Sequence, residues 1–320
     1  MLTSTLVSLD DIRAARDRVR RIAKVTPLVD ASWPAGRPLW LKCESMQPAG
    51  AFKIRGATNM VAQLTDEQRR RGVITFSSGN HGQAMALAAR ELGAPAVVVM
   101  PETAPAIKVE GARALGAEVI FAGRTSDDRR IRAEQIAAER GLTVVPPFDH
   151  PWIIAGQGTL GLEILDQLPE VGTVLVPIGG GGLASGVSAA IKEENPKVTV
   201  IGVEPTGSSS MKTSIGAGHP VQLPSTASIA DGLLTLKPGD LTFAHVQRFV
   251  DRIVTVDDRA IADAVMWLLL KAKVVAEPSG AATVAAAFDP DAAFTPPLVA
   301  IISGGNLDPA VLRGMLEKNQ

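Results

Sequence analysis

Short apolar runs alternate with longer amphipathic segments along most of this chain. Between residues 72 and 147 the apolar runs are VITFSS, AVVVMP, EVIFAG and LTVVPP, and segments of helical length such as SDDRRIRAEQIAAERG separate them. Short apolar strands separated by helices of ten or more residues are typical of parallel sheets with crossover helices. The pattern therefore predicts a small α/β unit at about 72–147.

A second series of the same kind follows. It predicts strands at TVLVPI, VTVIGVE, RIVTV and LVAIIS, and helices at LASGVSAAIKEENP and DDRAIADAVMWLLLKA. An N-terminal helix is predicted over about 9–24, where Ser8 and Asp11 form a capping pattern and apolar residues recur at helical spacing. The fold class is therefore α/β, with two open, mostly parallel sheets flanked by helices. We expect a ligand between the two sheets.

Composition narrows the class of protein. The 320 residues carry 32 Lys and Arg against 33 Asp and Glu with no long block of like charges, so nucleic acid is not an expected partner. No apolar run approaches the roughly 20 residues that span a bilayer, and the N-terminus lacks the pattern of a signal peptide, so no membrane partner is expected. The single Cys43 cannot form an internal disulfide and favours a reducing, cytoplasmic location.

Four consecutive glycines, Gly179 to Gly182, stand between the predicted strand TVLVPI and the helix that follows it. Backbone N–H groups without side chains approach an anion closely, and a helix N-terminus adds partial positive charge. The pattern predicts a phosphate site. One alternative stays open, because Gly179, Gly181 and Ala184 also fit GxGxxA, with Glu204 as the ribose-binding acid of a dinucleotide site.

Lys53 lies in the loop AGAFK among small and apolar residues. Withdrawal from water lowers the pKa of a lysine, so that its amine can act as a nucleophile and base and form a Schiff base with a carbonyl cofactor. Two further loops, SSGNHG and SGGN, follow predicted strands, and open α/β sheets bind ligands at the carboxyl ends of their strands. Together these loops favour a phosphate-bearing small-molecule cofactor held between two sheets.

Six segments resemble, in order, those of the fold-type II pyridoxal-phosphate enzymes, and within these the serine/threonine dehydratase and serine racemase branch. They are AGAFKIRGA (49–57), SSGNHGQA (77–84), IAGQGT (154–159), GGGGL (179–183), AEPSGA (276–281) and SGGN (303–306). The resemblance implies pyridoxal 5'-phosphate as cofactor and a homo-oligomer, dimer or tetramer. It also implies a large cofactor-binding domain of residues 1–62 plus 150–320, an inserted small domain of residues 63–149, and no C-terminal regulatory domain.

The resemblance further implies roles for the positions that match the family motifs. Lys53 is expected to carry the cofactor and to remove the Cα proton of the substrate, and Ser78 to act as an acid from the opposite face. The residues expected to bind the cofactor are Phe52, Lys53, Asn80, Gly179, Gly180, Gly181, Gly182, Leu183 and Ser303. Those expected at the substrate are Ser77, Ser78, Asn80, His81 and Arg129.

The implied reaction converts L-threonine, L-serine or a related β-hydroxy amino acid to a 2-oxo acid and ammonia. An amino-acid racemase with side dehydratase activity stays open, because Ser78 resembles the racemases whereas Phe148 resembles the dehydratases. A nicotinamide dehydrogenase and a cofactor-binding regulatory protein stay open as well. A metal is undecided: Glu204 and Ser208 match cation ligands of the racemases, but Ser210 stands where they have an aspartate.

Overall fold

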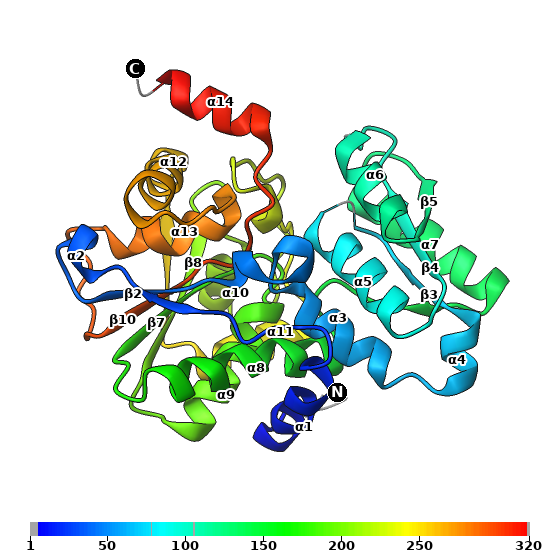
Figure 1. The fold of residues 1–320 in the computed structure, drawn as a ribbon, viewed down its shortest axis with the longest axis horizontal. Coiled ribbons are helices and arrows are strands. Elements are labelled where there is room, and N and C mark those ends of the chain that lie inside the picture. The colour runs from blue at the N-terminus through cyan, green and yellow to red at the C-terminus, as the bar shows by residue number, and fades with distance from the viewer. Residues whose placement is uncertain (1–5, 78, 105, 319–320) are drawn as a thin grey trace.

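The computed structural model describes residues 6–77, 79–104 and 106–318. Ser78, a predicted catalytic and substrate-binding residue, therefore lies outside the described residues. The chain forms two lobes, each built on its own sheet (Figure 1). In the part of the chain that the structure describes, no helix is long and apolar enough to cross a membrane.

The larger sheet has six strands in the order β1-β2-β10-β7-β8-β9. They span Leu28–Asp30 (β1), Leu39–Lys42 (β2), Thr173–Pro177 (β7), Thr199–Pro205 (β8), Arg252–Val256 (β9) and Leu298–Ile301 (β10). The β1–β2 pair is antiparallel and the other pairs are parallel. The second predicted series of strands is thus confirmed. The pattern assigned no strand to β1 and β2, which lie at the N-terminal end of the chain.

The smaller sheet has four parallel strands in the order β5-β4-β3-β6. They span Val73–Thr75 (β3), Ala96–Met100 (β4), Glu118–Phe121 (β5) and Thr143–Val144 (β6). This sheet is the predicted small α/β unit, and it is inserted in the chain between β2 and β7 of the larger sheet. The division into domains at residues 62/63 and 149/150 stays a prediction.

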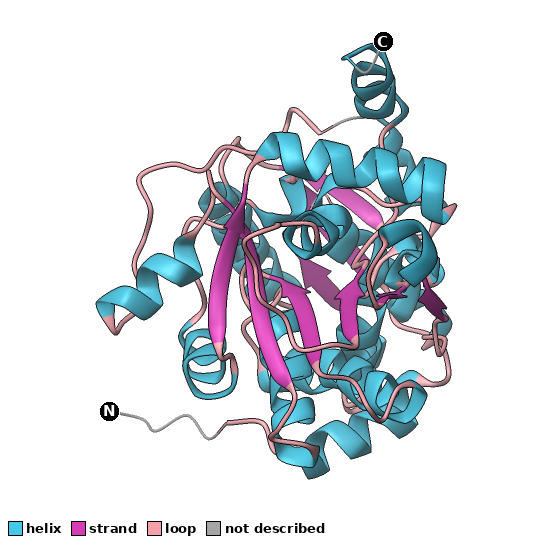
Figure 2. Cartoon of the chain, turned by 90° about the vertical axis from the view of Figure 1, so that its left-hand side faces the viewer, coloured by secondary structure: helices cyan, strands magenta, loops and turns pink. Residues whose placement is uncertain are grey.

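Helices cover both faces of the larger sheet (Figure 2). On one face α13 (Pro278–Ala287) packs against α12 (Asp258–Trp267). On the other face α9 (Gly182–Glu194) packs against α8 (Pro151–Gln167). Small aliphatic side chains fill both layers, which lets the helices approach the sheet closely. The other helices of this lobe are α1 (Leu9–Val19), α2 (Ser32–Ala35), α10 (Ser210–Ala217), α11 (Asp240–Phe249) and α14 (Pro309–Lys318).

The smaller sheet is covered in the same way. Helices α5 (Asn80–Glu91) and α6 (Ala106–Ala114) pack on one face and α7 (Ser126–Arg140) on the other, and α4 (Asp66–Arg71) leads into β3. Helix α3 (Lys53–Ala62) contacts both α8 of the larger lobe and α5 of the smaller one. The helix that begins at Lys53 therefore lies at the junction of the two lobes.

Two predicted helices are shorter than expected. The N-terminal helix ends at Val19 rather than near residue 24, because the backbone of Lys24 bonds to a side chain instead: its N–H donates to Oε1 of Gln47 at 2.9 Å, and its carbonyl accepts from Nε2 of Gln47 at 2.7 Å. The helix predicted to extend to Ala272 has an α-helical part that ends at Trp267, and residues 268–272 form a wider π turn.

Candidate active site

Lys53 is the first residue of α3. Its Nζ donates to the carbonyl oxygen of Pro147 at 2.8 Å and lies 5.0 Å from the ring centre of Phe52. Burial lowers the pKa of Lys53 to about 8, and among the described residues no carboxylate forms an ion pair with it that would oppose this. A lysine with such a pKa is partly a free amine near neutral pH, so it can attack a carbonyl group and later accept a proton.

The glycine loop from Gly179 to Gly182 connects β7 to α9, as predicted. A side chain at Gly180 or Gly182 would strike Phe148, and Gly181 has a φ of 94°, which L-residues rarely adopt. No described side chain caps the N-terminus of α9, so the N–H groups of its first turn remain available to an anion. The loop thus forms a cradle that fits a phosphate group.

The glycine loop and Lys53 are joined through one short segment. Pro147 accepts the hydrogen bond from Lys53, and the next residue, Phe148, packs on Gly180 and Gly182. On the far side of the loop, Oγ1 of Thr242 donates to the carbonyl of Gly180 at 2.7 Å. The structure therefore brings together an amine for a carbonyl group and a cradle for a phosphate.

The loop at residues 303–306 lies beside the segment that leads into Lys53. The N–H of Phe52 donates to the carbonyl of Ser303 at 3.0 Å, and Ala51 forms a bridge with Gly304. Nδ2 of Asn306 donates to Oδ1 of Asn80 at 2.8 Å. Ser303 and Asn80, both predicted cofactor ligands, are thus brought next to the Lys53 loop.

Glu277 is a residue of this site to which the sequence analysis assigned no role. Nδ2 of Asn80 donates to its Oε1 at 2.6 Å. Burial raises the pKa of Glu277 to about 7, although the bond from Asn80 acts in the opposite direction. The signal in the sequence is a lone carboxylate in the small and apolar segment AEPSGA. A buried carboxyl with a pKa near neutral is typical of functional sites.

His81 and Ser77 support the loop between β3 and α5. Nε2 of the buried His81 donates to the carbonyl of Val145 at 3.1 Å, and burial together with the nearby Lys53 lowers the pKa of His81 to about 3. The ring is therefore neutral near pH 7, and its Nδ1 is an acceptor rather than a donor. Oγ of Ser77 accepts from the N–H of Gly79 at 3.4 Å.

In the described part of the chain, the hydrogen bonds of Arg129 are local to the start of α7, and none joins it to the Lys53 loop. It lies in the first turn of α7, where Nη2 donates to Oγ of Ser126 at 2.9 Å and Nη1 to the carbonyl of Arg124 at 3.4 Å. Its Nε is buried and has no hydrogen-bond partner in the described part of the chain. A role at the substrate stays a prediction for this residue.

Glu204 ends β8 and is fully buried, and both carboxylate oxygens accept backbone N–H bonds at the start of α10, from Met211 at 2.9 Å and Lys212 at 2.8 Å. Burial raises the pKa of Glu204 to about 7. Ser208 donates its hydroxyl to the carbonyl of Leu233 at 2.9 Å. Among the described residues, no group of three His, Cys, Asp or Glu side chains could hold a metal ion.

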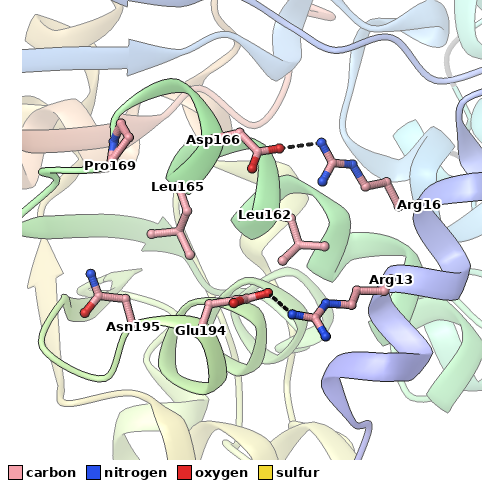
Figure 3. Close-up of a pocket in the computed structure, with 8 residues that line it drawn as sticks. All are labelled: Arg13, Arg16, Leu162, Leu165, Asp166, Pro169, Glu194 and Asn195. Carbon is pink, nitrogen blue, oxygen red and sulfur yellow. Dashed lines mark hydrogen bonds and ion pairs between the residues drawn. The ribbon is translucent and has the colours of Figure 1, made fainter.

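A cavity of about 290 Å³ lies away from these residues, between α1, α8 and α9 (Figure 3). Two exposed ion pairs line it: Arg13 with Glu194 at 2.5 Å, and Arg16 with Asp166. Leu162 and Leu165 lie between the pairs. The cavity contains none of the predicted site residues.

Comparison with known proteins identifies the family. Residues 19–304 match the family described as pyridoxal-phosphate dependent enzyme. The chain belongs to this family. The L-threonine ammonia-lyase of Thermotoga maritima is 44% identical over 316 residues, which cover 98% of this chain and 79% of that protein. The serine racemase of Oryza sativa is 42% identical over 319 residues, which cover 97% of this chain and 94% of the relative.

The fold agrees with this membership. The solved structure of maize serine racemase has a TM-score of 0.93 to this chain at 40% identity, and the match covers 98% of both chains. The predicted fold type and the predicted cofactor, pyridoxal phosphate, are confirmed. The dinucleotide interpretation of the glycine loop is wrong, because Glu204 is buried and engaged with α10 rather than free to bind a ribose.

Proposed function

We propose that this protein is a pyridoxal-phosphate-dependent ammonia-lyase that converts L-threonine, L-serine or a close β-hydroxy relative to a 2-oxo acid and ammonia. The observation that carries the proposal is the state of Lys53, whose amine has a pKa of about 8 and bonds to the carbonyl of Pro147 beside the glycine loop. The name of the Thermotoga relative, L-threonine ammonia-lyase, supports the same reaction.

The residues that would hold the cofactor surround this amine. Lys53 would bond to its aldehyde carbon, and the N–H groups of Gly179 to Gly182 and Leu183 would bind its phosphate. Asn80 would donate a hydrogen bond to the phenolic oxygen of the cofactor, the hydroxyl of Ser303 would face its ring nitrogen, and Phe52 would pack near the ring. Asn80 would donate through the amide that now bonds to Glu277, so the two side chains share one site.

The cofactor, when bound, supplies an electron sink for the electron pair left when the Cα proton is removed. Lys53 would take this proton, because its amine is free for a substantial part of the time near pH 8. Ser303 is a neutral hydroxyl, and unlike an aspartate it places no negative charge beside the ring nitrogen, which favours loss of the β-hydroxyl over amino-group transfer. For L-threonine the balance is one 2-oxobutanoate and one ammonia.

The substrate carboxylate would lie at the loop of the smaller lobe. Ser77 and Ser78 would donate hydroxyl and backbone groups to it, and Arg129 would reach it only if the first turn of α7 gave up its bonds to Ser126 and Arg124. His81 is a weaker candidate for direct contact. Its neutral ring already donates to Val145, so we assign it the support of this loop.

A second candidate function is amino-acid racemisation. The observation that favours it is the extent of the match, which covers 98% of the maize serine racemase and 94% of the rice serine racemase. Ser78 would supply the proton to the opposite face. The change Ser78→Ala should abolish racemisation while elimination from the L-isomer survives, and equal loss of both would contradict that role.

The deciding test measures 2-oxo acid formation by the cofactor-loaded protein with L-threonine, L-serine and their D-isomers, each alone. Turnover of the L-isomers supports the lyase and ranks its substrates. Racemisation without 2-oxo acid would overturn the lyase in favour of the second candidate. The proposal also includes a homo-oligomer, dimer or tetramer, in the cytoplasm, for which the single Cys43 and the resemblance to the family are the support.

A further inference from the structure

The segment that carries Lys53 is closed at its two ends by one ion pair. After β2 the chain passes through two short 3-10 helices, η1 (Glu44–Met46) and η2 (Pro48–Gly50), before α3 begins. Nε and Nη2 of Arg55 donate to the two carboxylate oxygens of Glu44 at 2.7 and 2.8 Å. The first residue of η1 and the third residue of α3 are thus joined by two parallel bonds, with Lys53 between them.

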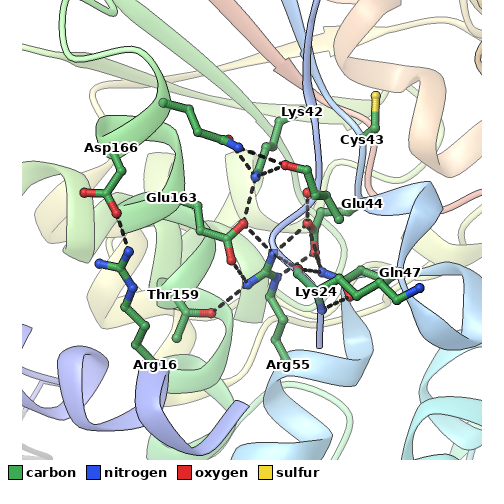
Figure 4. Close-up of polar contacts among 12 residues, drawn as sticks. Arg16, Lys24, Lys42, Cys43, Glu44, Gln47, Arg55, Thr159, Glu163 and Asp166 are labelled. Atoms are coloured by element: carbon green, nitrogen blue, oxygen red, sulfur yellow. Dashed lines mark hydrogen bonds and ion pairs between the residues drawn. The ribbon is translucent and has the colours of Figure 1, made fainter. Parts of the chain in front are cut away.

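Arg55 is held on its other edge by a second carboxylate. Nη1 and Nη2 donate to the two oxygens of Glu163 at 2.7 and 2.8 Å, and Nη1 also bonds Oγ1 of Thr159 at 3.1 Å (Figure 4). Lys42 donates to Glu163 at 2.7 Å. The positive charges of Lys42 and Arg55 therefore balance the negative charges of two carboxylates, and all four side chains are buried. The carboxylates belong to Glu44 and Glu163. We call Glu44, Arg55 and Glu163 the arginine clamp.

The closed segment has a backbone that needs such a restraint. Ala49 has a φ of 63°, unfavourable for a residue with a side chain, and Gly50 follows with a φ of 72°. On one side the loop at residues 303–306 holds it, since the N–H of Gly305 donates to the carbonyl of Gly50 at 2.9 Å. The arginine clamp is the restraint on the other side.

We infer that Arg55 is a positioning residue, which through Glu44 and Glu163 fixes the place of the Lys53 amine against Pro147. Arginine suits this task because its planar fork bonds a carboxylate on each edge, whereas an ammonium is a single point of attachment. The inference rests on the proposed function only for the meaning of Lys53 in catalysis. What the clamp controls is the surroundings of the amine itself.

The experiment measures how fast cofactor-free protein attaches pyridoxal phosphate to Lys53, by absorbance, over a range of pH. Attachment needs the free amine, so the rate rises with pH and its midpoint reports the pKa of Lys53, about 8 in the natural protein. His81 is the titratable group that faces Lys53, and it stays neutral throughout this range.

Two variants loosen the clamp in different ways. Arg55→Lys keeps the charge but loses the fork. The double variant E44Q/R55M removes one charge of each sign and leaves Lys42 paired with Glu163, so no buried charge is left without a partner. In both variants, the amine of Lys53 should lose its hydrogen bond to Pro147. The midpoint of the pH dependence of attachment should then rise toward 10.5, the ordinary pKa of a lysine. A rise of one pH unit lowers the attachment rate at pH 7 about tenfold.

Arg140→Met is the matched control, because Arg140 also bonds a carboxylate, Glu118, at 2.7 Å but on the surface. It should keep the natural midpoint. If Arg55→Lys or the double variant is folded, as judged by its melting curve, and still attaches the cofactor with the natural midpoint, the inference is overturned. The measurement uses no amino-acid substrate, so a chain without lyase activity would overturn the proposed function and leave this result standing.

Discussion

Lys42 and Lys53 stand at the two ends of one loop. Lys42 is fully buried and Lys53 is partly buried, and their bonded partners differ. Lys42 donates to Glu163 at 2.7 Å, to the carbonyl of Thr26 at 2.8 Å and to Gln167 at 2.9 Å. Burial lowers the pKa of Lys42, and the carboxylate of Glu163 opposes this. Lys53 has a carbonyl, and no carboxylate, as its bonded partner among the described residues.

The difference shows what makes a buried lysine reactive. A carboxylate partner keeps the ammonium charged and makes the lysine part of the fold, as at Lys42. A carbonyl partner accepts a hydrogen bond but gives the charge little compensation, so the neutral amine of Lys53 becomes accessible near pH 8. Both lysines are at least partly buried, and the bonded partner distinguishes their chemistry.

Replacing the reactive lysine is the largest perturbation of this comparison. Lys53→Met should abolish covalent attachment of pyridoxal phosphate and lower turnover by at least about 10³-fold, since one amine serves as both attachment point and base. The cofactor-free variant should melt no lower than the natural protein at pH 7, because no ion pair is lost. Absorbance spectra and 2-oxo acid assays check this, and a variant with natural turnover would remove Lys53 from the mechanism.

Replacing the structural lysine should have the opposite signature. Lys42→Met leaves Glu163 without one of its two cations in a buried site, which should lower the free energy of unfolding by about 3–5 kcal/mol. The attachment of pyridoxal phosphate by the folded fraction should continue. Urea unfolding checks the loss of stability, and the matched variant K42M/E163Q, which removes both charges, should recover part of it. Loss of attachment at full stability would contradict the division of roles.

The lowered pKa of Lys53 should also make stability depend on pH. The pKa of Lys53 is about 8 in the folded protein and 10.5 as its ordinary value, so between these pH values the unfolded chain binds more protons. The free energy of unfolding contributed by Lys53 therefore rises with pH across this window, by at most about 1.4 kcal/mol per pH unit. The difference between the natural protein and Lys53→Met in urea unfolding, at pH 7.5 and 10, isolates this contribution. An equal pH dependence in both proteins would contradict the lowered pKa.

A third lysine, Lys108, extends the comparison to an ion pair that is partly exposed to solvent. Lys108 of α6 pairs with Asp231 of η3 (Asp231–Leu233) at 3.1 Å, with side chains 31% and 62% exposed. Water already solvates such a pair, so Lys108→Met should change the free energy of unfolding by no more than about 1 kcal/mol. Asp231→Asn is the reciprocal control. A loss as large as that of Lys42→Met would show that a partner matters as much at the surface as in the interior.

Much of this arrangement could be predicted from local patterns. The glycine loop and Lys53 stand out because their neighbours are small and apolar, and the parallel strands follow from short apolar runs between helices. β1 and β2 were missed because they form an antiparallel pair separated by a helix of only four residues, α2, and so do not follow the alternation of strands and long helices. Arg129 was predicted only from its resemblance to a substrate-binding arginine of the family. In this structure it donates a hydrogen bond to Ser126 in its own helix turn.

The arginine clamp and the role of Glu277 could not be predicted in this way. Arg55 meets Glu163 across a sequence separation of 108 residues, and Asn80 meets Glu277 across 197. A buried arginine and a solvated one look the same in a sequence. Only the tertiary structure, which brings Glu44 of η1 and Glu163 of α8 to Arg55, shows that this arginine has carboxylates on both edges.

The position of β10 governs when this site can first exist during synthesis. β10 lies between β2 and β7, and the loop that follows it bonds to Gly50 and Phe52. A growing chain that has not yet emerged beyond residue 306 has β2 without its neighbour and the Lys53 segment without one of its two supports. Pairing across such a sequence distance is slow to form. The nascent polypeptide should therefore acquire its cofactor only after residue 306 has emerged from the ribosome, and shorter partial chains should not capture it.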